Sequence, residues 1–183
     1  MENSSISAPA GALKPGFILG LLFILILFIG YTVDATLLID TKFSGLIVLG
    51  LIIGAVVMAI QFRNSNGGHL SYGGSYSFHF ISLALGALLG VLFTILLFEV
   101  IDPGLQSFLG DIILEQVVDV LEKRGESMST INGRYDVLRD YAYNQVSAMS
   151  FMKTYIFLLV LFAIVSALVA LIAKKEKPGA EVY

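Results

Sequence analysis

The stretch FISLALGALLGVLFTILLF, residues 80–98, carries no charged side chain over its 19 residues. An α-helix rises about 1.5 Å per residue, so about 20 apolar residues cross the ~30 Å hydrocarbon layer of a bilayer. Uncharged runs of 19 or 20 residues also occur at 15–33, 43–62 and 154–173. The sequence therefore predicts four membrane-spanning helices, which we place at about residues 15–36, 43–62, 79–100 and 152–173.

The composition supports a protein embedded in lipid. Of the 183 residues, 57% are hydrophobic and 14% are charged, whereas an average globular domain has about 25% charged residues. The chain has no cysteine, which excludes disulfides, thiolate metal sites and cysteine nucleophiles. We predict an all-α membrane protein that forms one domain over residues 1–183 and contacts the lipid bilayer, with no role in nucleic-acid binding.

Four spans place both termini on the same side of the membrane. Basic residues close to span ends mark the cytoplasmic side, and Lys174, Lys175 and Lys177 directly follow the last span. Lys14 and Arg63 fall on this side too, against the acidic residues Glu2, Glu176 and Glu181. We expect cytoplasmic termini, and we expect the first span to be retained because it is too long for a cleaved signal peptide.

Residues 102–150 form the longest segment between spans, and their pattern predicts an amphipathic helical hairpin. Apolar residues recur at helical spacing in the first half: Leu105, Phe108, Leu109, Ile112, Ile113, Val117, Val120 and Leu121. Asp102-Pro103 suits a helix start and Gly125 a helix end. A second helix is expected from about Gly133, with Leu138, Tyr141, Ala142, Gln145 and Met149 on one side, running into the fourth span.

The apolar stripe of this hairpin has two interpretations. It packs on itself and on the span ends, or it docks a protein partner or a lipid surface. The polar face of the first helix is acidic, with Asp111, Glu115 and Glu122, which disfavours anionic lipid. We favour self-packing, because every amphipathic helix must bury its stripe somewhere.

Small residues recur at four-residue spacing on every predicted span. In lipid, apolar burial does not drive helices together, so close approach at small residues matters. The predicted helix-packing positions are Gly16, Gly20, Gly50, Gly54, Ser82, Gly86, Gly90, Thr94, Ala163 and Ala167. We expect them to pack one four-helix bundle, with the Ser82 and Thr94 hydroxyls bonding across helices. A homo-oligomer or a complex with a membrane-protein partner is the alternative use of one such stripe.

Ionisable side chains are absent from the middle of the predicted spans, which disfavours a proton-coupled transporter. Asp34, Asp40, Glu99 and Asp102 fall near the outer span ends. If Asp34, Glu99 and Asp102 gathered, they would form an acidic mouth able to bind a cation. We favour the simpler interpretation that these residues mark where helices leave the lipid.

The loop QFRNSNGGHLSYGGSYSFHF, residues 61–80, is rich in glycine and polar residues. Its glycines do not fit the spacing of a phosphate-binding loop, and two histidines without a third ligand make a weak metal site. Arg63 with Gly67 and Gly68 instead predicts a structured inner turn. We predict no catalytic residue, no cofactor and no metal.

Four segments carry a family resemblance: FRNSNGGHLSYGGSYSF (62–78), FEVIDPGL (98–105), IILEQ (112–116) and EKRGESMS (122–129). With these segments the chain resembles a four-span membrane family of Bacteroidota known as domain of unknown function 4199. The resemblance extends from about Gly16 to Lys177. It implies a bacterial inner membrane and four spans, and it supplies no activity.

Our first functional hypothesis is a multi-pass inner-membrane protein without catalysis that serves as an accessory or scaffold subunit of a membrane assembly. The alternative is a small channel or carrier for a lipid-linked or small solute, lined by Tyr31, Gln61, Ser82 and Thr94. An intramembrane enzyme ranks last, because the sequence offers no nucleophile with a base and no metal-binding set.

Overall fold

The computed structural model of the protein describes residues 7–65 and 67–175. Its long helices are α1 (Ala8–Val33), α2 (Thr41–Ser65), α3 (Tyr72–Leu96) and α7 (Ala148–Ala173). These four are long and apolar enough to cross a membrane, with α3 continuing to Ile101. The predicted all-α fold with four spans is thereby confirmed. The terminal charges Glu2, Glu176, Lys177 and Glu181 lie outside the described residues.

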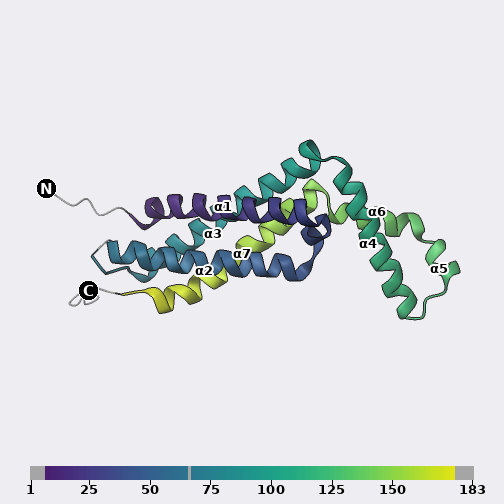
Figure 1. The fold of residues 1–183 in the computed structure, drawn as a ribbon. Helices are drawn as coiled ribbons and strands as arrows, with labels where there is room; N and C mark the ends of the chain where they lie inside the picture. Colours follow the sequence, from purple (N-terminus) through teal and green to yellow (C-terminus); the bar gives the residue numbers. More distant parts are fainter. Residues whose placement is uncertain (1–6, 66, 176–183) are drawn as a thin grey trace.

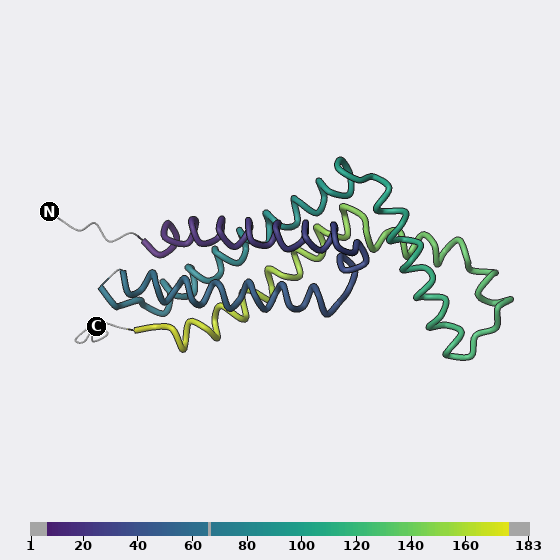
Figure 2. Tube along the Cα trace, in the orientation of Figure 1, coloured from purple at the N-terminus to yellow at the C-terminus, as the bar shows by residue number. Residues whose placement is uncertain are grey.

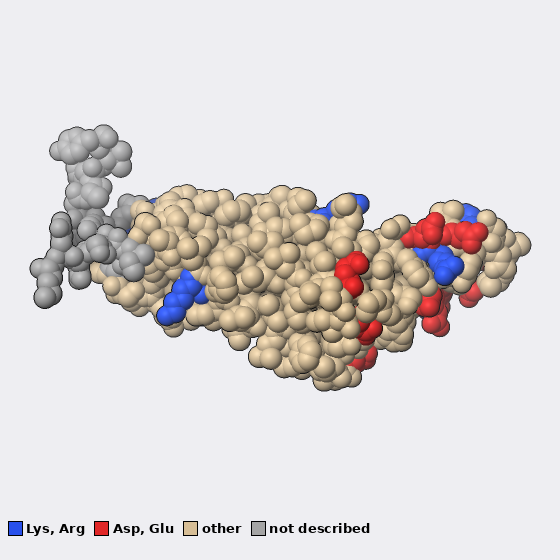
Figure 3. Space-filling view, turned by 90° about the horizontal axis from the view of Figure 1, so that it is seen from above, with Lys and Arg blue, Asp and Glu red and all other residues tan. Residues whose placement is uncertain are grey.

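The four long helices form one elongated bundle (Figure 1). α1 begins and α7 ends at the same end of the bundle, which we call the terminal end (Figure 2). Helices α4 (Gly104–Lys123), α5 (Met128–Asn132) and α6 (Tyr135–Gln145) project beyond the opposite end, which we call the hairpin end. Charged side chains gather over this projection, whereas most of the visible flank of the bundle is uncharged (Figure 3).

Helix α1 starts earlier and stops earlier than the predicted span of 15–36. It begins at Ala8, because a proline in the first turn suits a helix start even though Lys14 interrupts the uncharged run. It ends at Val33, where Asp34 accepts hydrogen bonds from the backbone and hydroxyl of Thr36. Those bonds start the short 3-10 helix η1 (Ala35–Ile39) that leads to α2.

Helix α3 also begins before its predicted span of 79–100. Ser71 caps its first turn by accepting a hydrogen bond from the amide of Gly74 at 3.1 Å. At the hairpin end the helix widens into the π-turn η2 (Leu97–Ile101), closed by the amide of Asp102 donating to the carbonyl of Leu97. This widening ends the span and leads directly into the hairpin.

The hairpin follows the predicted plan up to its tip. Helix α4 ends where Gly125 adopts φ +86°, a left-handed conformation in which a side chain would be strained. The amide of Glu126 then donates to the carbonyl of Leu121, which closes the helix end. Ser127 caps the extra helix α5, which the sequence did not predict, by accepting from the amide of Thr130.

The expectation that the second hairpin helix runs into the fourth span is wrong. Helix α6 ends at Gln145 and α7 begins at Ala148, with Ser147 capping α7 through the amide of Ser150. Val146 lies in this break and is 2% exposed, packed with Leu97 and Leu105. The chain therefore breaks the helix to bury an apolar side chain at the junction of bundle and hairpin.

Reciprocal glycine contacts join α1 to α3. A Cβ added to Gly16 or Gly20 would meet Leu85 or Leu89 at 3.0 Å or less. In return, a Cβ added to Gly90 would meet the Phe23 ring at 2.2 Å. A Cβ on Gly86 would lie 3.1 Å from Leu19 and 3.4 Å from the backbone of α1. Large side chains of each helix thus occupy the space that the glycines of the other leave open.

The remaining small residues divide into those that pack and those that do not. Gly54 contacts Leu19 of α1, whereas Gly50 has open space around it and lies on the exposed face of α2. On α7 the small residues that are fully buried are Ser166 and Ala170, beside the predicted Ala163 and Ala167, which are half-buried. Helical spacing identified the right helices, but it could not say which face turns inward.

We expect Gly86→Leu to destabilise the protein by about 1–3 kcal/mol, since the added side chain must push α1 away from α3. Gly50→Leu is the matched control, because its side chain enters open space on α2. Thermal unfolding of both variants in the same detergent is the measurement. Equal melting temperatures of the two variants would show that the α1–α3 contact does not determine the stability of the protein.

Candidate functional site

The predicted acidic mouth is not assembled at the hairpin end. Asp34 accepts both of its hydrogen bonds from Thr36, and these bonds hold the pKa of its carboxyl below the ordinary value. Glu99 is exposed on the π-turn, and Asp102 is engaged by Tyr31. Within residues 7–65 and 67–175, no three histidine or acidic side chains come close enough to hold a metal ion. Asp34 and Asp102 therefore serve the turns at which helices end.

One of these contacts links the bundle to the hairpin. The Tyr31 hydroxyl, on the last turns of α1, donates a 2.9 Å hydrogen bond to Asp102 Oδ2, directly before α4. Tyr31 also packs against an apolar cluster shared by η2, α4 and the α6–α7 break. The buried members of this cluster are Leu97, Phe98, Leu105, Leu109 and Val146. This junction sets how the hairpin projects from the bundle. The sequence showed both residues but gave no sign that they pair across 71 positions.

Buried polar side chains lie nearer the terminal end. His79 is 1% exposed, and its Nδ1 lies 2.7 Å from the carbonyl oxygen of Ser75. Ser82 is fully buried and donates to the carbonyl of Ala12, which confirms its predicted bond across helices. Thr94 instead donates to Gly90 of its own helix, so the prediction for Thr94 is wrong. A short hydroxyl on a helix satisfies itself on the preceding turn when no neighbouring carbonyl approaches.

The residues proposed to line a channel do not share one location. Gln61 is exposed on α2, and Ser82 is buried against α1. Tyr31 and Thr94 are engaged by Asp102 and by Gly90. The channel or carrier therefore stays a prediction.

The inner turn is fixed by backbone and arginine contacts. Gly67 and Gly68 both have φ +78°, and Arg63 Nη1 donates to the carbonyl of Ala173 at 2.9 Å. Leu70 and Lys175 exchange two backbone hydrogen bonds of 2.9 Å. Asn66 of this turn lies outside the described residues. The predicted turn residues Arg63, Gly67 and Gly68 thus position a connection that ties α2, α3 and α7 together.

The two hairpin helices pack on each other through Gly110. A Cβ there would lie 2.8 Å from the Tyr143 ring, and the Tyr143 hydroxyl donates to Asp111 at 2.7 Å. Leu109 and Ala142 are fully buried in this interface. The predicted self-packing of the stripe is therefore present along this line.

Part of the hairpin surface remains apolar and exposed. Val137 and Tyr141, one turn apart on α6, are 69% and 55% exposed. Tyr141 was expected on the packed side with Leu138 and Ala142, but the ring of Tyr143 occupies that side against α4. We call Val137 and Tyr141 the α6 patch. Val137 and Tyr141 are four residues apart and therefore share one face of α6. This spacing could have identified the patch only if the sequence had shown which face of α6 packs on α4.

Tyr31→Phe should loosen the orientation of the hairpin, since it removes a bond worth about 1 kcal/mol between α1 and the start of α4. Spin labels at Asn132→Cys and Ser44→Cys, in a chain without native cysteine, report the distance between hairpin and bundle. We expect a broader distance distribution than in Tyr72→Phe, a control at the terminal end. An unchanged distribution would show that the apolar junction alone orients the hairpin.

The comparison with protein families gives one match. The family described as protein of unknown function (DUF4199) matches residues 14–175, which include most of α1, the other three long helices and the hairpin. No curated protein and no solved structure matches the chain. This chain is a multi-pass membrane protein by its four long apolar helices, and because the match covers most of the sequence, it belongs to the DUF4199 family.

Proposed function

We propose that this protein is a non-catalytic subunit of an assembly in the bacterial inner membrane and that its hairpin docks another protein. The observation that carries the proposal is the α6 patch, which lies on a hairpin projecting beyond the bundle (Figure 1). The hairpin has a packed interior of its own, so these two side chains are not required for its folding. Exposed apolar side chains next to each other are typical of interaction surfaces.

The surroundings of the patch favour a protein partner. Asp136, Arg139 and Asp140 are exposed beside it, and an apolar centre with a polar rim is the usual composition of a protein interface. The neighbouring face of α4 carries exposed Asp111 and Glu115. Acidic residues are repelled by anionic lipid headgroups, which argues against a lipid surface as the occupant.

Four polar side chains of the bundle support a role without catalysis. Ser82, Thr94, Tyr31 and Arg63 all donate to backbone or side-chain acceptors that hold helices or turns in place. A catalytic site needs a nucleophile or base directed at a substrate-sized space. These side chains stabilise the fold instead.

The distribution of basic residues supports cytoplasmic termini. Lys14, Arg63 and Lys175 lie at the terminal end of the described bundle, and basic residues near span ends are retained on the cytoplasmic side. The hairpin then stands on the periplasmic side, where a partner would reach it.

Single cysteines test this orientation in the cysteine-free chain. In spheroplasts, an impermeant maleimide should label Asn132→Cys on the hairpin at once and Ser65→Cys only after the membrane is permeabilised. The reason is that only the hairpin end faces the outside. Immediate labelling of Ser65→Cys alone would reverse the assigned topology.

A photoreactive amino acid at position 137 tests docking in the native host. We expect it to crosslink to one defined protein, and the Tyr141→Ser change should lower the crosslinked yield about tenfold, as expected for an interface contact worth about 1.4 kcal/mol. Position 120 on α4, where Val120 is also exposed, is the control and should not crosslink to that protein.

Particle mass in a gentle detergent complements the crosslinking. A stoichiometric complex with the crosslinked protein supports the accessory role. A clean monomer or homo-oligomer without a crosslink at position 137 contradicts it, and solute flux in liposomes would then test the channel or carrier.

A further inference from the structure

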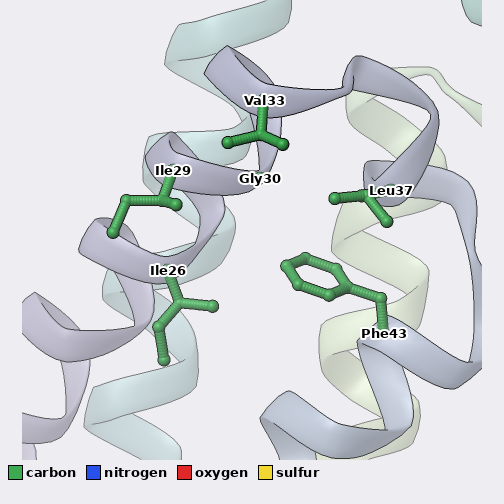
Figure 4. Close-up of a pocket in the computed structure, with 6 residues that line it drawn as sticks. All are labelled: Ile26, Ile29, Gly30, Val33, Leu37 and Phe43. Carbon is green, nitrogen blue, oxygen red and sulfur yellow. The ribbon is translucent and has the colours of Figure 1, made fainter.

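An apolar groove lies between α1 and α2 at the hairpin end. Its volume is about 200 Å³, and it is lined by Ile26, Ile29, Gly30, Val33, Leu37 and Phe43. The close-up shows the α1 residues on one side, with Leu37 and Phe43 facing them across the gap (Figure 4). The 3-10 helix η1 closes the groove at the top, so it opens sideways from the bundle.

The groove opens toward hydrocarbon. Ile26, Ile29 and Val33 are 40%, 50% and 75% exposed on a helix of membrane-spanning length. An apolar gap of this kind does not hold water well, because water needs polar partners. Leaving the gap empty would remove dispersion contacts from its walls. An acyl chain of the surrounding lipid needs no polar partner, and it restores the dispersion contacts of the walls.

The rim of the groove carries charges of both signs. Asp34 directly follows Val33, and Lys42 directly precedes Phe43, so both charges adjoin lining residues. Lys42 is exposed and makes no ion pair with any residue in the described part of the chain. The bonds from Thr36 end on Asp34 Oδ1, and the amide of Phe43 donates to Asp40 Oδ1 at 2.6 Å. The second carboxylate oxygen of each aspartate takes no part in these bonds.

We propose that this groove and its rim bind one zwitterionic phospholipid with a primary ammonium headgroup. One acyl chain lies between Ile29 and Phe43, the phosphate contacts the Lys42 ammonium, and the headgroup ammonium contacts Asp34 or Asp40. Two acids beside one lysine disfavour an anionic lipid, since its headgroup would add negative charge to an acidic rim. They equally disfavour a choline headgroup, whose quaternary nitrogen cannot donate a hydrogen bond to a carboxylate.

The absence of native tryptophan allows a direct test. Ile29→Trp places a single fluorophore in the groove, and Phe28→Trp places one at nearly the same depth and exposure on another face of α1. Each protein is reconstituted in equal mixtures of phosphatidylethanolamine and phosphatidylcholine, with brominated chains on one lipid or on the other. Bromine quenches the fluorophore only on contact, so the two samples report which lipid occupies the groove.

We expect brominated phosphatidylethanolamine to be favoured at Ile29→Trp by about two- to fivefold, the range that one exposed ion pair supplies. Phe28→Trp should show no preference. Asp34→Asn with Asp40→Asn should remove the preference, because the carboxylates are what separate the two headgroups, and asparagine keeps an oxygen for the turn bonds. Asp136→Asn with Asp140→Asn, two exposed acids on α6, is the matched control and should retain it. Leu37→Trp is a second reporter in the groove if Ile29→Trp does not fold.

Two results would overturn the assignment. Equal quenching by both lipids at the groove reporter would identify ordinary boundary lipid. A preference for brominated phosphatidylglycerol, measured in the same way, would mean that the acidic rim does not select the headgroup.

Discussion

The close contact of α1 with α3 is the constraint on which the rest of the bundle depends. In lipid, helices gain little from burying apolar surface against each other, so shape complementarity must hold them. Gly16 and Gly20 receive leucines of α3, while Gly86 and Gly90 receive Leu19 and Phe23 of α1. Because α3 also packs against α2 and α7, this contact places the central helix for all the others.

The hairpin is oriented from this bundle by a small junction. The π-turn at the end of α3 leads into α4, Val146 fills the break before α7, and Tyr31 reaches Asp102 from α1. Helices α1, α3, α4 and α7 thus meet at one apolar cluster with one polar bond at its edge. A surface on the hairpin is held in a defined direction relative to the membrane, which is what docking to a partner requires.

Several polar groups within the spans are satisfied by a nearby backbone carbonyl. A hydroxyl or imidazole in hydrocarbon must find an acceptor or donor nearby. Ser82 finds one on α1, and Thr94 and His79 Nδ1 find theirs on the preceding turn of α3. Among the described residues, the buried atoms Ser166 Oγ and His79 Nε2 have no such partner. Charged residues instead lie at the helix ends, where Asp34 and Asp40 begin the next turn or helix. At the hairpin end, Asp34, Asp40 and Lys42 together give the rim of the α1–α2 groove charges of both signs.

The sequence by itself determined the four long helices, the helical hairpin and the inner turn. Those features follow from local properties: the length of uncharged runs, the spacing of apolar residues and the positions of Gly67, Gly68 and Gly125. Only the tertiary structure decided that Gly50 faces outward, that Asp102 pairs with Tyr31 rather than with Glu99, and that Tyr141 is exposed. Periodicity defines the faces of a helix, but which face meets a neighbour depends on contacts between residues far apart in the chain.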